Sequence, residues 1–394
     1  MTIRLNGADV TKPKEVEAMI DQALRQGICS KNESPRFGFI QRWLISGFMN
    51  KNKHGGDLMK RIFWIVAAMG VFFSLCLVCP TSYAQEKVIT LNFANFFPPE
   101  NRISLFIVQW CKEVDKRTNG RVKVTPFPGG TLSPPAQTYV GVVKGIADIG
   151  VSFMGYSLGR FPLSEVIDLP LGYKSGYVGT KMANEYYKKF RPKEFDEVKV
   201  LFLHTSPPHL LFTKKPVSNL EELKGLKIRS NSPIVKPLGA VPVGMPMSDA
   251  YDALSKGVVQ GIICPYEPMK GFNLAGVVTH STEYGSAFVG SAFVVMNKGK
   301  WNAFPADIQK IIEEMDVEYI EKLGKVWDDS DQEGKEFFIQ KGGKVIVLSK
   351  AENERWAERV RPVLDDYVRD MKSKGLPGDE ALKFCIDYLK THQK

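Results

Sequence analysis

Residues 88–127 read VITLNFANFFPPENRISLFIVQWCKEVDKRTNGRVKVTPF. The run 88–94 is mostly apolar and typical of a buried strand. Five apolar residues then recur at the spacing of one helix face: Ile103, Phe106, Ile107, Trp110 and Val114. Gly120 ends this helix, and 121–127 forms a second strand. A helix of this length between two strands predicts a crossover connection and a parallel strand pair.

The same alternation continues along the chain. Strands are expected at 147–153, 198–203, 210–212, 225–229, 289–297 and 345–347. Helices are expected at 136–144, 219–223, 232–238, 248–256 and 305–341, and again from the last strand to the end. Ser248 is expected to cap the helix at 248–256. The pattern predicts a doubly wound α/β protein with largely parallel sheets, whose two rigid lobes enclose a ligand cleft at the carboxyl ends of the strands.

The composition is that of an ordinary globular protein, with 44% hydrophobic and 24% charged residues in a chain of 394. The net charge is +10, but about half of it lies in residues 1–61 and no basic run with interleaved aromatics follows. We therefore expect no nucleic-acid partner. Only Cys111, Cys264 and Cys385 follow the targeting segment described below. Their odd number and wide spacing predict no disulfide framework and no metal site.

A targeting signal begins at Met59, where two basic residues precede an apolar run at 62–78 and small residues precede Gln85. These are the parts of a secretory signal peptide at 59–84, and they predict an exported protein that begins at Gln85. One alternative is a membrane anchor, although the apolar run is short for a hydrocarbon core about 30 Å thick. The other is a lipoprotein cut at Cys79.

Residues 1–58 precede this signal, although a signal peptide normally stands at the start of a chain. The codons for Gly55-Gly56-Asp57 can spell a strong bacterial ribosome-binding sequence, one codon before Met59. We therefore predict that residues 1–58 are upstream sequence joined to the gene. The alternative is a real extension with a short helix at 13–26.

Gly155-Tyr156-Ser157-Leu158-Gly159 matches the G-x-S-x-G pattern directly after a predicted strand. In α/β hydrolases this turn presents a nucleophilic serine and leads straight into a helix. Here Pro162 would interrupt the first turn of such a helix. We expect no catalytic residue in the chain, and a secreted serine esterase using Ser157 is kept as an alternative.

Arg229 ends the short apolar strand at 225–229 and precedes Ser230-Asn231-Ser232-Pro233, which resembles a helix start. A guanidinium at the carboxyl end of a strand, beside a helix N-terminus, favours an anion in the cleft. A carboxylate fits the guanidinium fork in a bidentate manner. The alternative is a structural salt bridge between Arg229 and a nearby acid.

The segment LEELKGLKIRS at 220–230 resembles the signature of the DctP-type solute receptors of tripartite (TRAP-type) transporters. The similarity continues in family order in the segments LGAVPVGMP at 238–246, SDAYDAL at 248–254 and GVVQG at 257–261, and upstream in GGTL at 129–132 and in residues 142–149.

This resemblance implies a two-lobed periplasmic-binding-protein (Venus-flytrap) fold with hinge strands and a long helix crossing between the lobes. It places lobe I at 85–206 plus 290–333 and lobe II at 207–289 plus 334–394. It also implies a periplasmic receptor, without catalysis or cofactor, that captures a small organic acid. Delivery would be to the small and large integral membrane subunits of the transporter. A periplasmic ligand-sensing domain with the same fold is the other alternative.

In that family the arginine matching Arg229 pairs with the carboxylate of the ligand. Many acidic-sugar receptors carry a second arginine about where His209 stands, and receptors with a metal have a carboxylate near Ile263-Cys264, which this chain lacks. We therefore expect no metal. The other candidate ligand-binding residues are His209, Asn231, Met247, Cys264, Tyr266, Glu267, Phe96, Phe97 and Met154. One charged anchor among apolar walls favours a monocarboxylate, aromatic or branched.

Overall fold

The computed structural model describes residues 4–5, 8–9 and 88–393. The first two pairs form strands β1 (Arg4–Leu5) and β2 (Ala8–Asp9), which pair in antiparallel fashion. The predicted signal peptide at 59–84 and nearly all of the predicted upstream extension lie outside the described residues. None of the helices in the described part combines the length and the hydropathy needed to cross a membrane.

The sheet of the first lobe has the strand order β4-β3-β5-β12-β6. Its strands are β3 (Ile89–Asn95), β4 (Val122–Phe127), β5 (Ile149–Phe153), β6 (Val198–Thr205) and β12 (Ser291–Asn297). The helices of this lobe are α4 (Arg102–Arg117), α5 (Thr138–Val143), α6 (Gly176–Phe190) and α10 (Lys298–Asn302). β3 runs parallel to β4, as the pattern of residues 88–127 predicts.

Apolar side chains cover both faces of this sheet. Along β12, Phe293 and Val295 join one core, while Val294 and Met296 join the other. This is the alternation expected of a strand that is buried on both sides. The first lobe is therefore a helix–sheet–helix sandwich.

The sheet of the second lobe has the order β13-β11-β7-β10-β8-β9. Its strands are β7 (Leu210–Thr213), β8 (Lys227–Arg229), β9 (Val241–Val243), β10 (Gly261–Cys264), β11 (His280–Glu283) and β13 (Lys344–Val347). The helices around it are α7 (Leu220–Leu223), α8 (Ala250–Ser255), α9 (Glu267–Gly271) and α12 (Lys350–Val360).

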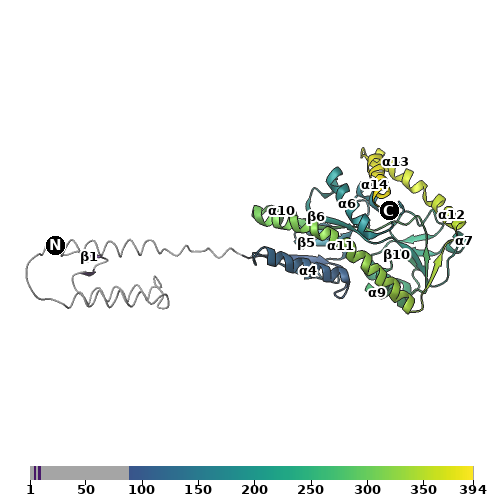
Figure 1. Ribbon diagram of the computed structural model, residues 1–394, viewed down its shortest axis with the longest axis horizontal. Coiled ribbons are helices and arrows are strands. Elements are labelled where there is room, and N and C mark those ends of the chain that lie inside the picture. The colour runs from purple at the N-terminus through teal and green to yellow at the C-terminus, as the bar shows by residue number, and fades with distance from the viewer. Residues whose placement is uncertain (1–3, 6–7, 10–87, 394) are drawn as a thin grey trace, which may run out of the picture. The chain divides into compact units, whose positions relative to one another are not determined.

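The long helix α11 (Ala306–Gln340) connects the two lobes, because it packs on α4, α6 and β6 of the first lobe and on α9 of the second. The chain also crosses between the lobes from β6 to β7 and from β11 to β12. The two-lobed α/β fold with a long crossing helix is thus confirmed. The last helices, α13 (Pro362–Ser373) and α14 (Gly378–His392), return to the first lobe, where α14 lies beside α6 (Figure 1).

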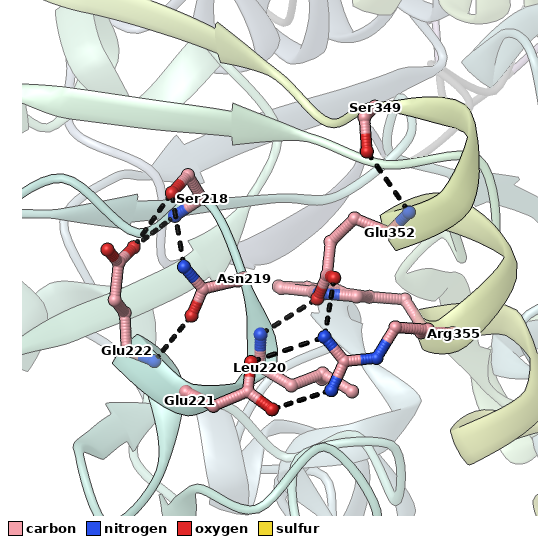
Figure 2. A network of polar contacts seen from close by, with 9 residues as sticks. Ser218, Asn219, Leu220, Glu221, Glu222, Ser349, Glu352 and Arg355 are labelled. Atoms are coloured by element: carbon pink, nitrogen blue, oxygen red, sulfur yellow. Dashed lines mark hydrogen bonds and ion pairs between the residues drawn. The ribbon is translucent and has the colours of Figure 1, made fainter.

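A polar network holds the short helix α7 against α12, and Figure 2 shows its members. Asn219 caps α7 by accepting a hydrogen bond from the Glu222 amide at 3.0 Å. The buried Glu352 carboxylate accepts the Leu220 amide at 2.8 Å and the Trp356 indole N–H at 3.0 Å. Because α7 leads directly into β8, this network fixes the position of the strand that ends at Arg229.

The prediction lacks α6, α9, β9 and β11, and four further features differ from it. The sheets are mixed, because the chain returns to the first sheet through β12, antiparallel to β5 and β6. Residues 232–238 form turns and no helix, since the prolines at 233 and 237 lack the N–H that helical hydrogen bonds need. A 3-10 turn, Met247–Asp249, precedes α8, so Ser248 is not its cap. Helices α13 and α14 share a core with the first lobe, whereas the prediction placed 334–394 in lobe II.

Candidate ligand-binding site

A cavity of about 620 Å³ lies between the two lobes, where the carboxyl ends of several strands meet. Phe96 follows β3, Ser206 follows β6, and Arg229 ends β8. The walls are rich in aromatic side chains, namely those of Phe96, Phe97, Phe153, Tyr156, Phe272, Phe288, Trp327 and Tyr367. The volume and the apolar lining are those of a small-molecule site.

Packing among the aromatic rings holds these walls in place. The rings of Phe96 and Phe97 lie 4.1 Å apart between centroids, and Phe97 meets Trp327 of α11 at 5.8 Å. Phe153 makes an edge contact with Tyr156 at 5.6 Å. Contacts of this kind add to the stability gained by burial and leave flat apolar surfaces facing the cavity.

Arg229 is the buried cation of the cavity, only 5% exposed, whereas Lys236, which also lines the cavity, is exposed. Its Nε and Nη2 donate to the carbonyl oxygen of Met245 at 3.0 and 2.7 Å, and Nη2 also lies 3.3 Å from the Tyr156 hydroxyl. Within residues 88–393, no carboxylate lies within ion-pair distance of the guanidinium, and Nη1 has no hydrogen-bond partner. The structural salt bridge considered above is therefore absent from the described part. A buried, unpaired cation is a costly arrangement that an anionic ligand would relieve.

His209 supplies a neutral polar group on the same cavity wall. Its Nε2 lies 2.8 Å from the Ser206 hydroxyl, which also accepts the Gly290 amide at 2.9 Å. The ring packs on Phe288 with centroids 4.6 Å apart. Burial, together with the charge of Arg229, lowers the pKa of His209 to about 3. The imidazole is thus uncharged at neutral pH, and its Nδ1 has no partner in the described part of the chain.

Five acidic side chains line the cavity, those of Glu165, Asp168, Glu267, Asp366 and Asp370, and burial weakens the acidity of Glu267 and Asp168. It raises the pKa of Glu267 to about 8, although a hydrogen bond of 2.6 Å from the Asn101 amide to its Oε1 opposes the shift. Burial likewise raises the pKa of Asp168 to about 7, against a hydrogen bond of 2.6 Å from the Ser291 amide. Glu267 is therefore mostly protonated at neutral pH, and Asp168 is more readily protonated than an exposed aspartate. They repel an anion beside Arg229 less than ordinary carboxylates would.

Most of the predicted site residues lie on the cavity wall: Arg229, His209, Asn231, Met247, Glu267, Phe96 and Phe97. Cys264, Tyr266 and Met154 do not line the cavity. Cys264 and Tyr266 lie in a core of the second lobe, because Ile263 and Pro265 take the cavity side of the chain at the end of β10. Met154 turns into a core of the first lobe, and its neighbour Phe153 faces the cavity instead.

Several cavity residues were missed by the sequence analysis. Trp327 lies in α11, far along the chain from every motif, and only the packing of α11 across both lobes brings it to the cavity. Tyr156 lies within the G-x-S-x-G segment, in which the hydrolase pattern points to the serine and not to the tyrosine. Its position three residues after the end of a strand at the cleft is the signal in the sequence.

The same segment does not form a nucleophile turn. The Ser157 hydroxyl donates to the Ala136 carbonyl at 3.3 Å, and within residues 88–393 no histidine is hydrogen-bonded to it. Turns follow Ser157 in place of the required helix. The esterase alternative has no support. In the described part of the chain, no group of three or more His, Cys, Asp or Glu side chains is arranged to hold a metal ion.

Comparison with known proteins agrees with this geometry. Residues 93–370 match the DctP model, described as bacterial extracellular solute-binding protein, family 7. The outer membrane transporter protein TsaT of Comamonas testosteroni is 28% identical over 77% of this chain and 92% of its own length.

Two solved structures cover 78% of this chain. A TRAP periplasmic solute binding protein from Desulfovibrio salexigens is 35% identical, with a TM-score of 0.69 over 97% of its length. A TRAP solute binding protein from Rhodoferax ferrireducens, in complex with copurified benzoate, is 28% identical, with a TM-score of 0.74 over 99% of its length.

Proposed function

This chain belongs to the DctP family of bacterial extracellular solute-binding proteins, and on that premise we propose that its cavity binds an aromatic monocarboxylate through Arg229. The protein is a TRAP-type solute-binding receptor for organic acids. We also propose that it is exported by the signal peptide at 59–84 and delivers its ligand to the small and large membrane subunits of its transporter.

The observation that carries the ligand proposal is the unpaired guanidinium of Arg229 inside aromatic walls. A carboxylate would receive the free N–H groups of the guanidinium, and a flat ring would lie against the aromatic side chains. A second carboxylate would find no second cation on the His209 side, because that imidazole stays neutral. The Rhodoferax relative, which copurified with benzoate, supports the same ligand class.

The test is a binding screen by thermal shift and calorimetry on the chain from Gln85 onward, after removal of any copurified ligand by unfolding and refolding. Benzoate should raise the melting temperature and bind. Benzamide has nearly the same shape without the charge, and cyclohexanecarboxylate keeps the charge without the aromatic ring, so both should bind more weakly. Stronger binding of succinate than of benzoate would refute the proposed ligand class.

A further inference from the structure

The segment Gly155-Tyr156, in the 3-10 turn that follows strand β5 of the first lobe, makes polar contacts with the second lobe. The Asn231 side-chain amide donates to the Gly155 carbonyl at 2.9 Å. The Met247 backbone amide donates to the Tyr156 hydroxyl at 3.1 Å, and Arg229 Nη2 lies 3.3 Å from the same hydroxyl. One tyrosine of the first lobe thus contacts both the anchoring arginine and the backbone of the second lobe.

The Tyr156 ring is fixed from the first lobe. It makes edge contacts with Phe96 at 5.8 Å and with Phe153 at 5.6 Å. On the other side, the Arg229 Cζ lies 5.9 Å from the ring centroid. The hydroxyl is therefore positioned by one lobe and contacted by the other, so that it responds to any change in their separation.

The second lobe is shaped to reach this segment. A side chain at Gly244 would place its Cβ 2.8 Å from the Asn231 Oδ1, so a glycine there leaves the room that Asn231 occupies. Asn231 in turn donates to Gly155, as described above. A larger residue at 244 would therefore press on the Asn231 side chain that makes this contact.

The Tyr156 hydroxyl accepts hydrogen bonds through its oxygen but, in the described part of the chain, does not donate one. A tyrosine hydroxyl can accept hydrogen bonds and donate one. Tyr156 accepts from Met247 and from Arg229, and within residues 88–393 its O–H has no acceptor. This donor lies beside the guanidinium that would hold the ligand carboxylate.

We propose that Tyr156 couples ligand binding to lobe closure: its O–H donates to the ligand carboxylate held by Arg229, while its oxygen accepts the Met247 amide of the opposite lobe. The anion then completes a set of contacts that joins the two lobes. This role rests on the proposed function, since it requires a carboxylate at Arg229. It assigns to the G-x-S-x-G segment a binding and positioning role through its tyrosine and none through its serine.

The test compares Tyr156→Phe with Tyr173→Phe, using benzoate as the probe. Tyr173 is a matched control, because its buried hydroxyl donates to the Ile167 carbonyl at 2.7 Å within the first lobe and does not line the cavity. Tyr156→Phe should weaken benzoate binding about 10-fold to 100-fold, as expected for one hydrogen bond to a charged group. Tyr173→Phe should lower the melting temperature without changing the affinity.

Amide exchange at Met247 provides a readout of coupling. In wild type, benzoate should slow exchange of this amide strongly, and in Tyr156→Phe the slowing should be lost even at saturating benzoate. Equal benzoate affinity in wild type and Tyr156→Phe would overturn the proposal. Weaker binding with unchanged Met247 protection would show that Tyr156 only contacts the ligand, and would overturn the coupling.

Failure of the ligand class is distinguishable from failure of the coupling. If the wild-type protein does not bind benzoate, the proposed ligand class is wrong. Amide exchange at Met247, compared between the ligand-free wild type and ligand-free Tyr156→Phe, then tests whether Tyr156 contacts the second lobe. Equal exchange in ligand-free wild type and Tyr156→Phe would overturn it in that case.

Discussion

Replacing Arg229 by alanine should abolish tight ligand binding while leaving the ligand-free fold nearly as stable. The guanidinium is the only cation that we assign to the ligand carboxylate, and it lies in a cavity with aromatic walls. Removing one partner of a buried charge pair costs about 3–5 kcal/mol, or roughly two to four decades of affinity.

Arg229→Ala has two opposing effects on the stability of the ligand-free protein. Arg229→Ala loses the hydrogen bonds to the Met245 carbonyl and to the Tyr156 hydroxyl, each worth about 1 kcal/mol. It also removes a cation that is buried without a carboxylate partner, which is a gain. We therefore expect the free energy of unfolding to change by no more than about 1–2 kcal/mol.

The assay measures benzoate affinity by calorimetry and stability by denaturation on the same preparations. Arg229→Lys keeps the charge but loses the planar fork, so its affinity should fall between those of wild type and Arg229→Ala. Arg160→Ala is the control, because Arg160 pairs with Glu197 and stacks on Tyr139 at 4.2 Å away from the cavity lining. Near-normal affinity in a folded Arg229→Ala protein would refute the reasoning.

Three further predictions follow from the fold and the sequence. Glu352→Ala should lower the free energy of unfolding by about 2–4 kcal/mol, because it leaves two buried N–H donors unpaired. Glu354 is exposed, so Glu354→Ala should change the free energy of unfolding little. Equal effects of the two substitutions in urea denaturation would contradict this. Burial raises the pKa of Glu267 to about 8, so the folded state holds this proton more tightly than the unfolded state, and stability should fall as pH rises from about 4.5 to 8. Glu267→Gln should flatten this part of the pH profile, and an unchanged slope would exclude Glu267 as its source. N-terminal sequencing of the exported protein should give Gln85, whereas a chain that retains 59–84 would disprove cleavage.

The elements that the sequence predicts best are those with a strong periodic pattern. The residues that form β3, α4 and β4 carry alternating or helical apolar spacing, and their bounds agree closely with prediction. Residues 232–238 have apolar residues at helical spacing, but the prolines within them remove the hydrogen bonds of a helix. In residues 232–238 the apolar pattern indicates which side chains are buried, but the prolines determine the backbone conformation.

The cavity was only partly predictable, for a different reason. Arg229 ends β8 and Phe96 directly follows β3, so strand ends alone place them at the cleft. Trp327 reaches the same cavity from the middle of a long helix, and only tertiary packing specifies which face of α11 borders it. Cys264 shows why a place near the cleft is not enough. Neighbouring residues on a strand point to opposite faces, so the side chain of Cys264 lies in the core while Ile263 faces the cavity.

The charges around the cavity fit a receptor that closes on a single anion. Arg229 bears a positive charge without a carboxylate partner in the described part of the chain, while His209 is neutral and Glu267 is largely protonated. An anion at Arg229 would therefore meet a buried attractive charge, and its binding would offset the cost of burying that cation. Because Arg229 belongs to the second lobe and its contact Tyr156 to the first, this gain is largest when the lobes are together. Ligand binding would thus favour closure through the same side chain that provides affinity.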